Sequence, residues 1–225
     1  MLDRKKVLEF FDGELVGRQI NIVGCGAIGS HIAEELARMG CVNIHLWDFD
    51  TVSPHNITNQ MFKEADIGRP KVDAVYDMMI EINKDLEKKV VKHNCAVKAP
   101  WFLNGYIFLC ADSIDVRKEI VKANAMNPNA EAVFDFRMRL TDAQHYCADL
   151  RQPDEVKKIL STMDFTQEEA DAATPKSACG TELSVIYTVK TIVSVGICNF
   201  VKFVQGAGHK TIALVDMNQF AIDAF

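Results

Sequence analysis

A glycine-rich turn near the start of the chain constrains its fold more than any other feature. Gly24, Gly26 and Gly29 follow a predicted strand at residues 18–23 and precede residues 28–39, whose apolar positions have helical spacing. Glycines at this spacing permit a tight turn, a close approach of the backbone to a phosphate, and close packing of a helix on a strand. The N–H groups and the dipole at the start of such a helix attract anions. The residues expected to surround a phosphate are Gly24, Gly26, Ala27, Ile28 and Gly29.

Strands and helices are expected to alternate through the rest of the first half. The pattern predicts strands at 42–47, 90–97, 106–109 and 132–136, helices at 71–83 and 114–125, and a short amphipathic helix at 3–11. Strands interleaved with helices indicate an α/β fold with a Rossmann-like, mostly parallel sheet and helices on both of its faces.

The second half has a different pattern. Residues 139–178 are polar and are interpreted either as a crossover segment or as a small subdomain. A long apolar helix at 181–204 and a last strand at 211–215 follow. Because the helix is apolar nearly all round, it must be covered on every side, by the rest of the monomer or by a second copy of the chain. Two lysines within it, Lys190 and Lys202, argue against a membrane span.

A length of 225 residues suits one domain. We divide it into a nucleotide-binding half at 1–137, a crossover segment at 138–180, and the helix with the last strand at 181–225. The net charge of −6 makes a nucleic acid an unexpected partner.

Seven cysteines occur at irregular spacings, and the N-terminus lacks the apolar core of a signal peptide. Free thiols in a reducing cytoplasm are therefore expected. Four of these cysteines lie in apolar stretches and are predicted to be core residues: Cys25, Cys41, Cys110 and Cys198.

Asp48 lies 24 residues beyond Gly24, at the end of the second predicted strand, where an acid would bind ribose hydroxyls. This arrangement fits either NAD or ATP. A dehydrogenase would also need a catalytic His or a Tyr-x-x-x-Lys set further along the chain. Tyr187 and Lys190 are only three residues apart and fall in the apolar helix, so they do not supply one.

Further motifs favour ATP. Residues 47–62 contain Asp48-Phe49-Asp50-Thr51-Val52 and continue to Asn56-Ile57-Thr58-Asn59-Gln60, residues 68–71 read Gly68-Arg69-Pro70-Lys71, and Cys110-Ala111-Asp112 ends a strand. With the glycine turn, these stretches resemble the ubiquitin-activating-enzyme superfamily, the ThiF/MoeB/HesA proteins. That family has a D-x-D-x-V segment leading to N-x-x-R-Q, then G-x-P-K, then C-x-D. The resemblance covers about residues 15–137 well and the remainder loosely.

The resemblance implies an adenylyltransferase that binds Mg-ATP and adenylates a carboxyl group, often the C-terminus of a small ubiquitin-like carrier protein or peptide. Family members are commonly dimeric, so a homodimer is expected. The family pattern assigns phosphate contacts to Lys71, the magnesium ion to Asp112, the ribose to Asp48, and the nucleotide pocket to Asn56 and Gln60. Asp50 is either part of the nucleotide site or a turn residue. Alternatively, Lys71 is a solvated residue at a helix start, and Asp112 is the N-cap of the helix near residue 114.

The chain departs from the family at Asn59, where an arginine is usual. Arg69 or Lys63 is a candidate to replace the missing charge near the phosphates. Arg4 and Arg18 are candidates for a further arginine that the family donates across its dimer interface. These departures indicate a divergent branch resembling the stand-alone ThiF-family proteins, in which a stretch similar to Asp135-Phe136-Arg137-Met138 occurs.

Family members also place a functional cysteine near the position of Cys179. A thiol at a helix start is more acidic than usual, so Cys179 is the candidate for acyl or sulfur transfer; alternatively it is an idle cysteine. Cys147, two residues after His145, is a weaker candidate for this role. Two other functions stay open: a nucleotide-binding scaffold that has lost catalysis, suggested by Asn59, and an NAD-dependent oxidoreductase.

Overall fold

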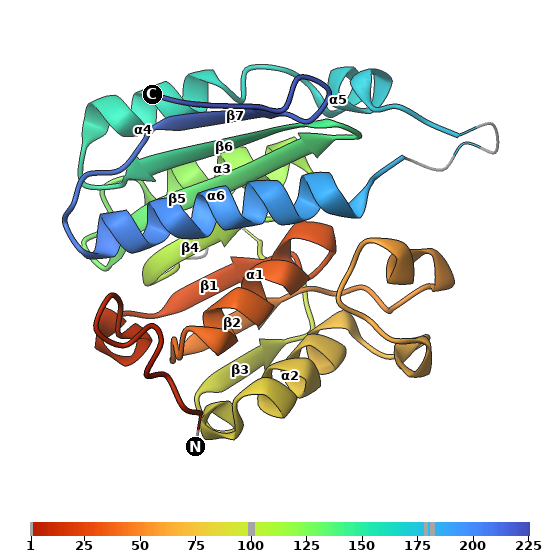
Figure 1. Cartoon of the computed structure of the whole chain (residues 1–225). Coiled ribbons are helices and arrows are strands. Elements are labelled where there is room, and N and C mark those ends of the chain that lie inside the picture. Colours follow the sequence, from red (N-terminus) through yellow and green to blue (C-terminus); the bar gives the residue numbers. More distant parts are fainter. Residues whose placement is uncertain (1, 99–101, 178–179, 181–182) are drawn as a thin grey trace.

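The computed structural model describes residues 2–98, 102–177, 180 and 183–225. In this part of the chain, eight strands form one sheet in the order β3-β2-β1-β4-β5-β6-β7-β8 (Figure 1). The strands are β1 (Ile20–Val23), β2 (Ile44–Trp47), β3 (Val90–His93), β4 (Gly105–Leu109), β5 (Ala130–Arg139), β6 (Asp142–Asp149), β7 (Ile212–Asp216) and β8 (Ala221–Ala224). The pairs from β3 to β5 are parallel, and those from β5 to β8 are antiparallel.

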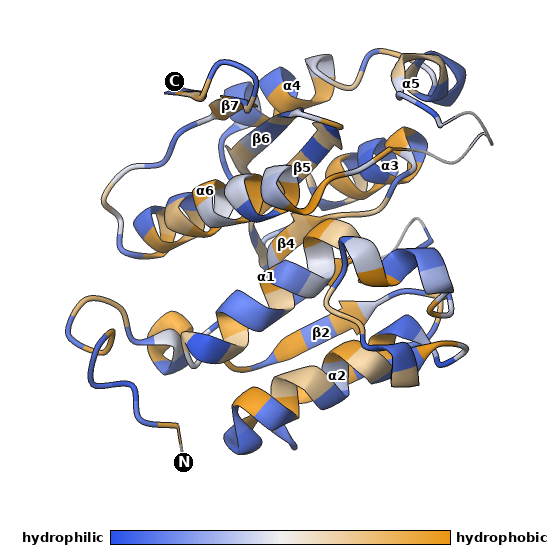
Figure 2. Ribbon diagram, turned by 45° about the vertical axis from the view of Figure 1, so that its right-hand side comes forward, coloured by the Kyte–Doolittle hydropathy of each residue, from blue (hydrophilic) through white to orange (hydrophobic). Residues whose placement is uncertain are grey.

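Helices cover both faces of the sheet (Figures 1 and 2). One face carries α1 (Ala27–Arg38), α2 (Lys71–Ile82) and α6 (Ile186–Val204), and the other carries α3 (Ile114–Asn124), α4 (Pro153–Ser161) and α5 (Gln167–Ala173). Short 3₁₀ helices are η1 (Gly13–Val16), η2 (Pro54–Thr58), η3 (Glu64–Asp66) and η4 (Lys84–Leu86). The expectation of a mostly parallel α/β sheet with helices on both faces is confirmed.

Two hydrophobic cores explain why the helices pack where they do. On the first face, Ile32 and Leu36 of α1 and Val193 and Phe200 of α6 are fully buried. On the second face, Ile120 and Val121 of α3 pack with the buried chains of β4 and β5. The central strands are therefore apolar on both sides, as is typical of a parallel sheet covered by helices.

The sequence pattern did not reveal every element. The stretch at 139–178, interpreted as a crossover segment or subdomain, contributes β6 to the sheet and then forms α4 and α5. The predicted helix at 3–11 is wrong, because residues 5–10 form successive turns instead. The strand expected at 90–97 ends at His93, and β8 was not predicted.

The long apolar helix, α6, is shorter than the predicted 181–204 and begins at Ile186. By length and composition it could cross a membrane, but half of its apolar window is buried against the fold. Its exposed side chains include Lys190, Ser194, Cys198 and Lys202. Ile186 and Tyr187 of the first turn are also exposed. The described monomer therefore covers only part of α6, and covering by a second copy of the chain stays a prediction.

Candidate nucleotide site

The glycine turn joins β1 to α1 and lies against the end of β4. Gly24 has a φ of +94°, and a Cβ atom there would lie 2.7 Å from the backbone N of Ala111. At Gly29, a Cβ atom would lie 1.8 Å from the backbone O of Gly24. Only glycine fits either position. The turn and the Cys110-Ala111-Asp112 segment, two motifs far apart in the sequence, are thereby in contact.

Asp48, at the end of β2, braces the same turn. Its Oδ2 accepts a hydrogen bond from the N–H of Cys25 at 2.6 Å, and its Oδ1 accepts one from the N–H of Asp50 at 2.8 Å. Burial raises the pKa of the Asp48 carboxyl, although these hydrogen bonds oppose the shift. Each carboxylate oxygen keeps a further lone pair for a ligand hydroxyl. The predicted ribose acid therefore lies beside the predicted phosphate turn.

Lys71 is the first residue of α2, and its side chain is only 11% exposed. Its Nζ lies 2.8 Å from Oδ2 of Asp50, which is half exposed. Its backbone N–H also donates to the backbone O of Asp50, at 2.9 Å. The alternative of a solvated helix-start lysine is therefore wrong, because this ammonium is buried and fixed to the loop that follows β2.

Gln60 and Gly26 leave an unfilled polar position at this edge of the sheet. Within the described part of the chain, Gln60 Oε1 is the one buried side-chain oxygen or nitrogen that lacks a hydrogen-bond partner. A Cβ atom at Gly26 would lie 4.0 Å from it. Gly26 is also the N-cap of α1, which has no side-chain cap. Unpaired N–H groups of the first helical turn and an unpaired buried acceptor therefore lie together, as a polar ligand would require.

Asn56 has a more local role than its neighbour Gln60. It is buried, and its Oδ1 accepts a hydrogen bond from the N–H of Ser53 at 2.8 Å. This bond fixes the start of η2, the segment that positions Gln60. Asn56 therefore supports the loop whether or not it also touches a nucleotide.

Asp112 follows β4 and is exposed. The alternative that it caps α3 is wrong, because Ser113 is the N-cap and accepts a hydrogen bond from the N–H of Val116. Asp112 and Asp50 supply carboxylate oxygens, the ligand type that Mg²⁺ prefers. The described residues contain no cluster of three metal-binding side chains, so a magnesium ion here would take its other ligands from phosphates and water.

Comparison with known proteins identifies the family. The ThiF family model matches residues 13–130, which is more than half of the chain and includes the turn, Asp48, Lys71 and Asp112. The chain belongs to the ThiF family. Molybdopterin-synthase adenylyltransferase of Escherichia coli K12 is 31% identical over 116 residues, covering 49% of this chain and 47% of that protein. Ubiquitin-like modifier-activating enzyme 5 of Arabidopsis thaliana is 39% identical over 67 residues, covering 30% and 16% respectively.

Solved structures of low sequence identity share the fold. The crystal structure of E. coli MccB with ATP superposes with a TM-score of 0.70 at 16% identity, covering 94% of this chain and 64% of that one. The crystal structure of PaaA gives a TM-score of 0.73 at 15% identity, covering 98% and 71%. The chain spans about half the length of the adenylyltransferase relatives that it matches.

Asn59, at the position where the resemblance led us to expect an arginine, is buried and hydrogen-bonded. Its Nδ2 donates to Oγ of Ser184 at 2.6 Å, and its backbone O lies 3.3 Å from Nε2 of His31. The side chain thus ties the loop that carries Gln60 to the segment just before α6. An amide can make this bond, but it brings no positive charge to the site.

The cations proposed to replace that charge are all bonded to carboxylates. Arg69 contacts both Asp66 and Asp77, and Lys63 contacts Glu81. Of the arginines proposed to act across a dimer, Arg4 contacts Asp12 and Arg18 contacts Glu131. Lys71 is also paired with a carboxylate, but its partner, Asp50, belongs to the Asp48–Val52 motif of the predicted nucleotide site.

Cys179 lies outside the described residues. Cys147 is buried, and burial raises its pKa well above the usual range, so it is poorly suited to be a nucleophile. Burial lowers the pKa of the neighbouring His145 to about 4, so this imidazole is neutral. Cys198, expected in the core, is exposed, and that prediction is wrong.

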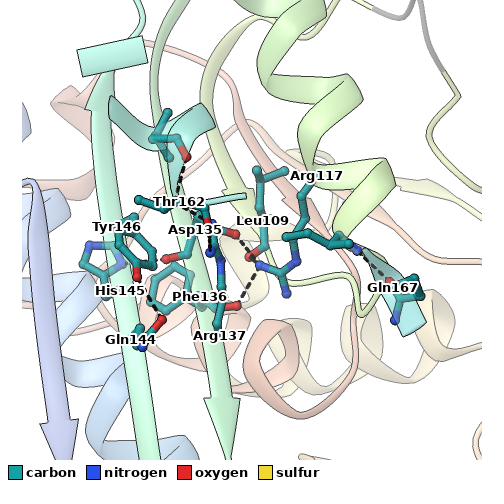
Figure 3. A network of polar contacts seen from close by, with 12 residues as sticks. Leu109, Arg117, Asp135, Phe136, Arg137, Gln144, His145, Tyr146, Thr162 and Gln167 are labelled. Carbon is teal, nitrogen blue, oxygen red and sulfur yellow. Dashed lines mark hydrogen bonds and ion pairs between the residues drawn. The ribbon is translucent and has the colours of Figure 1, made fainter. Parts of the chain in front are cut away.

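A buried ionic network that the sequence pattern did not predict supports the strand next to the site (Figure 3). Asp135 is fully buried on β5 and contacts both Arg117 of α3 and Arg137. Arg117 also donates to the backbone O of Leu109, at 3.1 Å, and Arg137 donates to the backbone O of Thr162, at 2.6 Å. The network joins β5 to the end of β4, from which the Cys110–Asp112 segment continues. The D-x-R-M resemblance was the one sequence signal of this network.

Proposed function

We propose that the chain adenylates a carboxyl group with ATP, and that this carboxyl is the C-terminus of a small ubiquitin-like carrier protein or peptide. A carboxylate oxygen would form a bond to the α-phosphorus while the bond to pyrophosphate breaks. The observation that carries the proposal is the unpaired Gln60 Oε1 beside Gly26, at the uncapped start of α1, in a chain of the ThiF family.

The residues at this edge suit that reaction because both reactants are anions. Backbone N–H groups of the turn and the Lys71 ammonium provide the positive potential that allows them to approach. Asp48 would hold the ribose, and Gln60 would accept a hydrogen bond from the nucleotide. Asp112, together with Asp50, would hold Mg²⁺, which supplies further neutralisation of phosphate charge when it is bound.

The carrier class is supported by what the relatives are named. One group is called molybdopterin-synthase adenylyltransferase and another ubiquitin-like modifier-activating enzyme, and MccB has been crystallised with MccA. The family match also favours ATP over the NAD-dependent alternative. As parts of the same proposal, the Cys179 thiolate attacks the acyl carbon of the adenylate and forms a thioester while AMP leaves. The chain is also proposed to form a homodimer and to act in the cytoplasm.

Isotope exchange between pyrophosphate and ATP tests the activity. We expect exchange only when a carrier with a free C-terminal carboxylate is present, and none when that carboxylate is amidated. Loss of exchange with every carboxylate, with ATP binding retained by calorimetry, would instead support a nucleotide-binding scaffold without catalysis. The uncharged Asn59 is the observation that favours this second candidate.

A further inference from the structure

A groove lies along one side of α6, next to the last strands of the sheet. It encloses about 590 Å³ between α6 and the last two strands, β7 and β8. In Figure 1, α6 crosses in front of the sheet, and β7 lies above it in the view, beyond β6. The lining residues are Lys190, Thr191, Ser194, Val195, Cys198, Asn199, Lys202, Lys210, Ala213, Ile222 and Ala224.

The floor of this α6 groove is apolar. Val195 of α6 and Ala213 of β7 form part of it, and Ile222 and Ala224 of β8 extend it toward the sheet edge. Ile222 is 56% exposed and lies beside these smaller apolar groups. Such a surface favours an occupant that brings apolar side chains of its own.

The rim of the groove is positive. Lys190, Lys202 and Lys210 line it, and none of its described lining residues is acidic. A carboxylate does lie close by, since Glu35 of α1 accepts a hydrogen bond from Oγ of the lining Ser194 at 3.1 Å. All three lysines are exposed, and none makes an ion pair within the described residues. Since the whole chain carries a net charge of −6, these unpaired lysines mark a local region of opposite sign.

The spacing of the lysines defines the length of the occupant. Lys190 and Lys202 are twelve residues apart on one helix, which corresponds to about 18 Å at 1.5 Å per residue. An extended peptide spans that distance with about five or six residues, at about 3.3 Å each. Lys210 joins the Lys202 end, because its backbone O accepts a hydrogen bond from Asn199 at 2.8 Å.

We propose that the α6 groove binds an extended acidic segment of a partner protein. The segment has one carboxylate near Lys190, apolar side chains over Val195 and Ile222, and one or two carboxylates near Lys202 and Lys210. A second copy of this chain that docked through the same groove would bring three more lysines against the first three, so the charge disfavours that arrangement; a homodimer formed through another face is not affected. A nucleic acid would place a phosphate backbone on an apolar floor, on a protein whose net charge repels it.

Fluorescence anisotropy tests the proposal with the full chain and no ATP. The probe is a fluorescein-labelled peptide with one acidic residue, four alternating valines and threonines, and two acidic residues. We expect saturable binding that weakens with salt, and none with a peptide that carries lysines in place of the acids. Absence of saturable binding up to about 1 mM peptide would overturn the proposal.

Two groove variants, each with a matched control, locate the binding. Reversing two charges with Lys190→Glu and Lys202→Glu is expected to weaken binding by about tenfold or more, because two attractions become repulsions. The same net change at the exposed Lys84 and Lys157, outside the groove, is expected to leave affinity within about twofold. Equal losses in both double variants would overturn the assignment, since they would reflect net charge alone.

Filling the groove separates shape from charge. Cys198→Trp puts a large side chain at an exposed position in the lining, and Cys95→Trp does the same at an exposed position outside it. We expect only Cys198→Trp to reduce peptide binding, with circular dichroism unchanged in both. Two results would overturn the proposal. Equally tight binding of a single-stranded oligonucleotide would indicate that the groove binds nucleic acid, and a dimer that the peptide dissociates would indicate that it binds a second copy of the chain.

Discussion

Replacing Lys71 by methionine removes the ammonium of the proposed site and keeps a side chain of similar length. An ammonium about 4 Å from a phosphate oxygen contributes roughly 4 kcal/mol at an effective dielectric constant of 20. Lys71 must first leave Asp50, its partner at 2.8 Å. Because Asp50 is half exposed, that ion pair is worth at most about 1 kcal/mol. The net loss is therefore about 3 kcal/mol, or roughly two orders of magnitude in kcat/KM.

The assay is pyrophosphate–ATP exchange, with urea unfolding as a check on stability. Lys92→Met is a matched control. Lys92, like Lys71, pairs with an aspartate, in this case Asp73 of α2, but it lies on strand β3 at the edge of the sheet. We expect this control to keep activity within about threefold, and both variants to lose no more than about 1 kcal/mol of stability. An exchange rate for Lys71→Met within about threefold of the unaltered chain would refute the electrostatic argument.

Asp50→Asn probes the same pair from the other side. Without its carboxylate partner, Lys71 is free to meet the nucleotide, so ATP should bind more tightly in the absence of Mg²⁺. Exchange in the presence of Mg²⁺ should fall if Asp50 is a metal ligand. Unchanged ATP affinity without Mg²⁺ would mean that the ion pair does not compete with the nucleotide.

Three further predictions concern the turn, the unpaired acceptor and acid stability. Gly29→Ala should destabilise the fold by about 3 kcal/mol because its Cβ would overlap backbone, whereas Gly26→Ala should cost no more than about 1 kcal/mol yet weaken ATP binding. Thermal unfolding measures the stability and calorimetry the ATP affinity, and equal stability losses in the two variants would contradict the packing argument. Gln60→Leu should leave the ligand-free fold at least as stable, because it removes a buried oxygen without a hydrogen-bond partner, and it should lower the affinity for ATP. A loss of stability in urea would show that the amide already has a partner. His145 has a folded-state pKa of about 4, below its unfolded value of about 6.5, so the unfolded chain binds the proton first and stability should fall by about 3 kcal/mol as the pH drops from 6.5 to 4. His145→Gln should lose this part of the pH dependence. If urea unfolding gave the same change in stability with pH for both proteins, the result would count against this prediction.

The first half of the fold was predictable because its signals are local. The central strands are buried on both faces and are rich in apolar residues, as in Tyr106–Leu109 and, apart from Asn21, in Ile20–Val23. The motifs then fixed which loops meet at the carboxyl edge of the sheet. Gly24, Asp48 and Lys71 consequently lie where the family pattern indicated, although their roles stay predictions.

The second half was harder because burial there contradicts residue type. β6 carries Gln144, His145 and Asp149, so it reads as a polar segment. His145 is nevertheless fully buried, because Asn199 and the backbone of Asp135 satisfy both of its ring nitrogens. Such long-range pairing has no local signature in the sequence.

Ion-pair partners were equally hidden. Nothing in the spacing of Arg69 shows that Asp77, almost two turns into the next helix, pairs with its guanidinium. Cys198 was misplaced for a related reason. It follows Ile197 in an apolar run, but the helix turns it outward between Lys190 and Lys202.

The hydrogen bonds of Asp48 have a consequence for how a ligand would be received. Both carboxylate oxygens accept hydrogen bonds from backbone N–H groups, those of Cys25 and Asp50, in the absence of a nucleotide. The backbone around Gly24–Cys25 and Asp50 therefore loses its conformational entropy during folding, and not when a ligand binds. A pocket of this kind is preorganised, and its backbone would need little rearrangement between the free and the loaded protein.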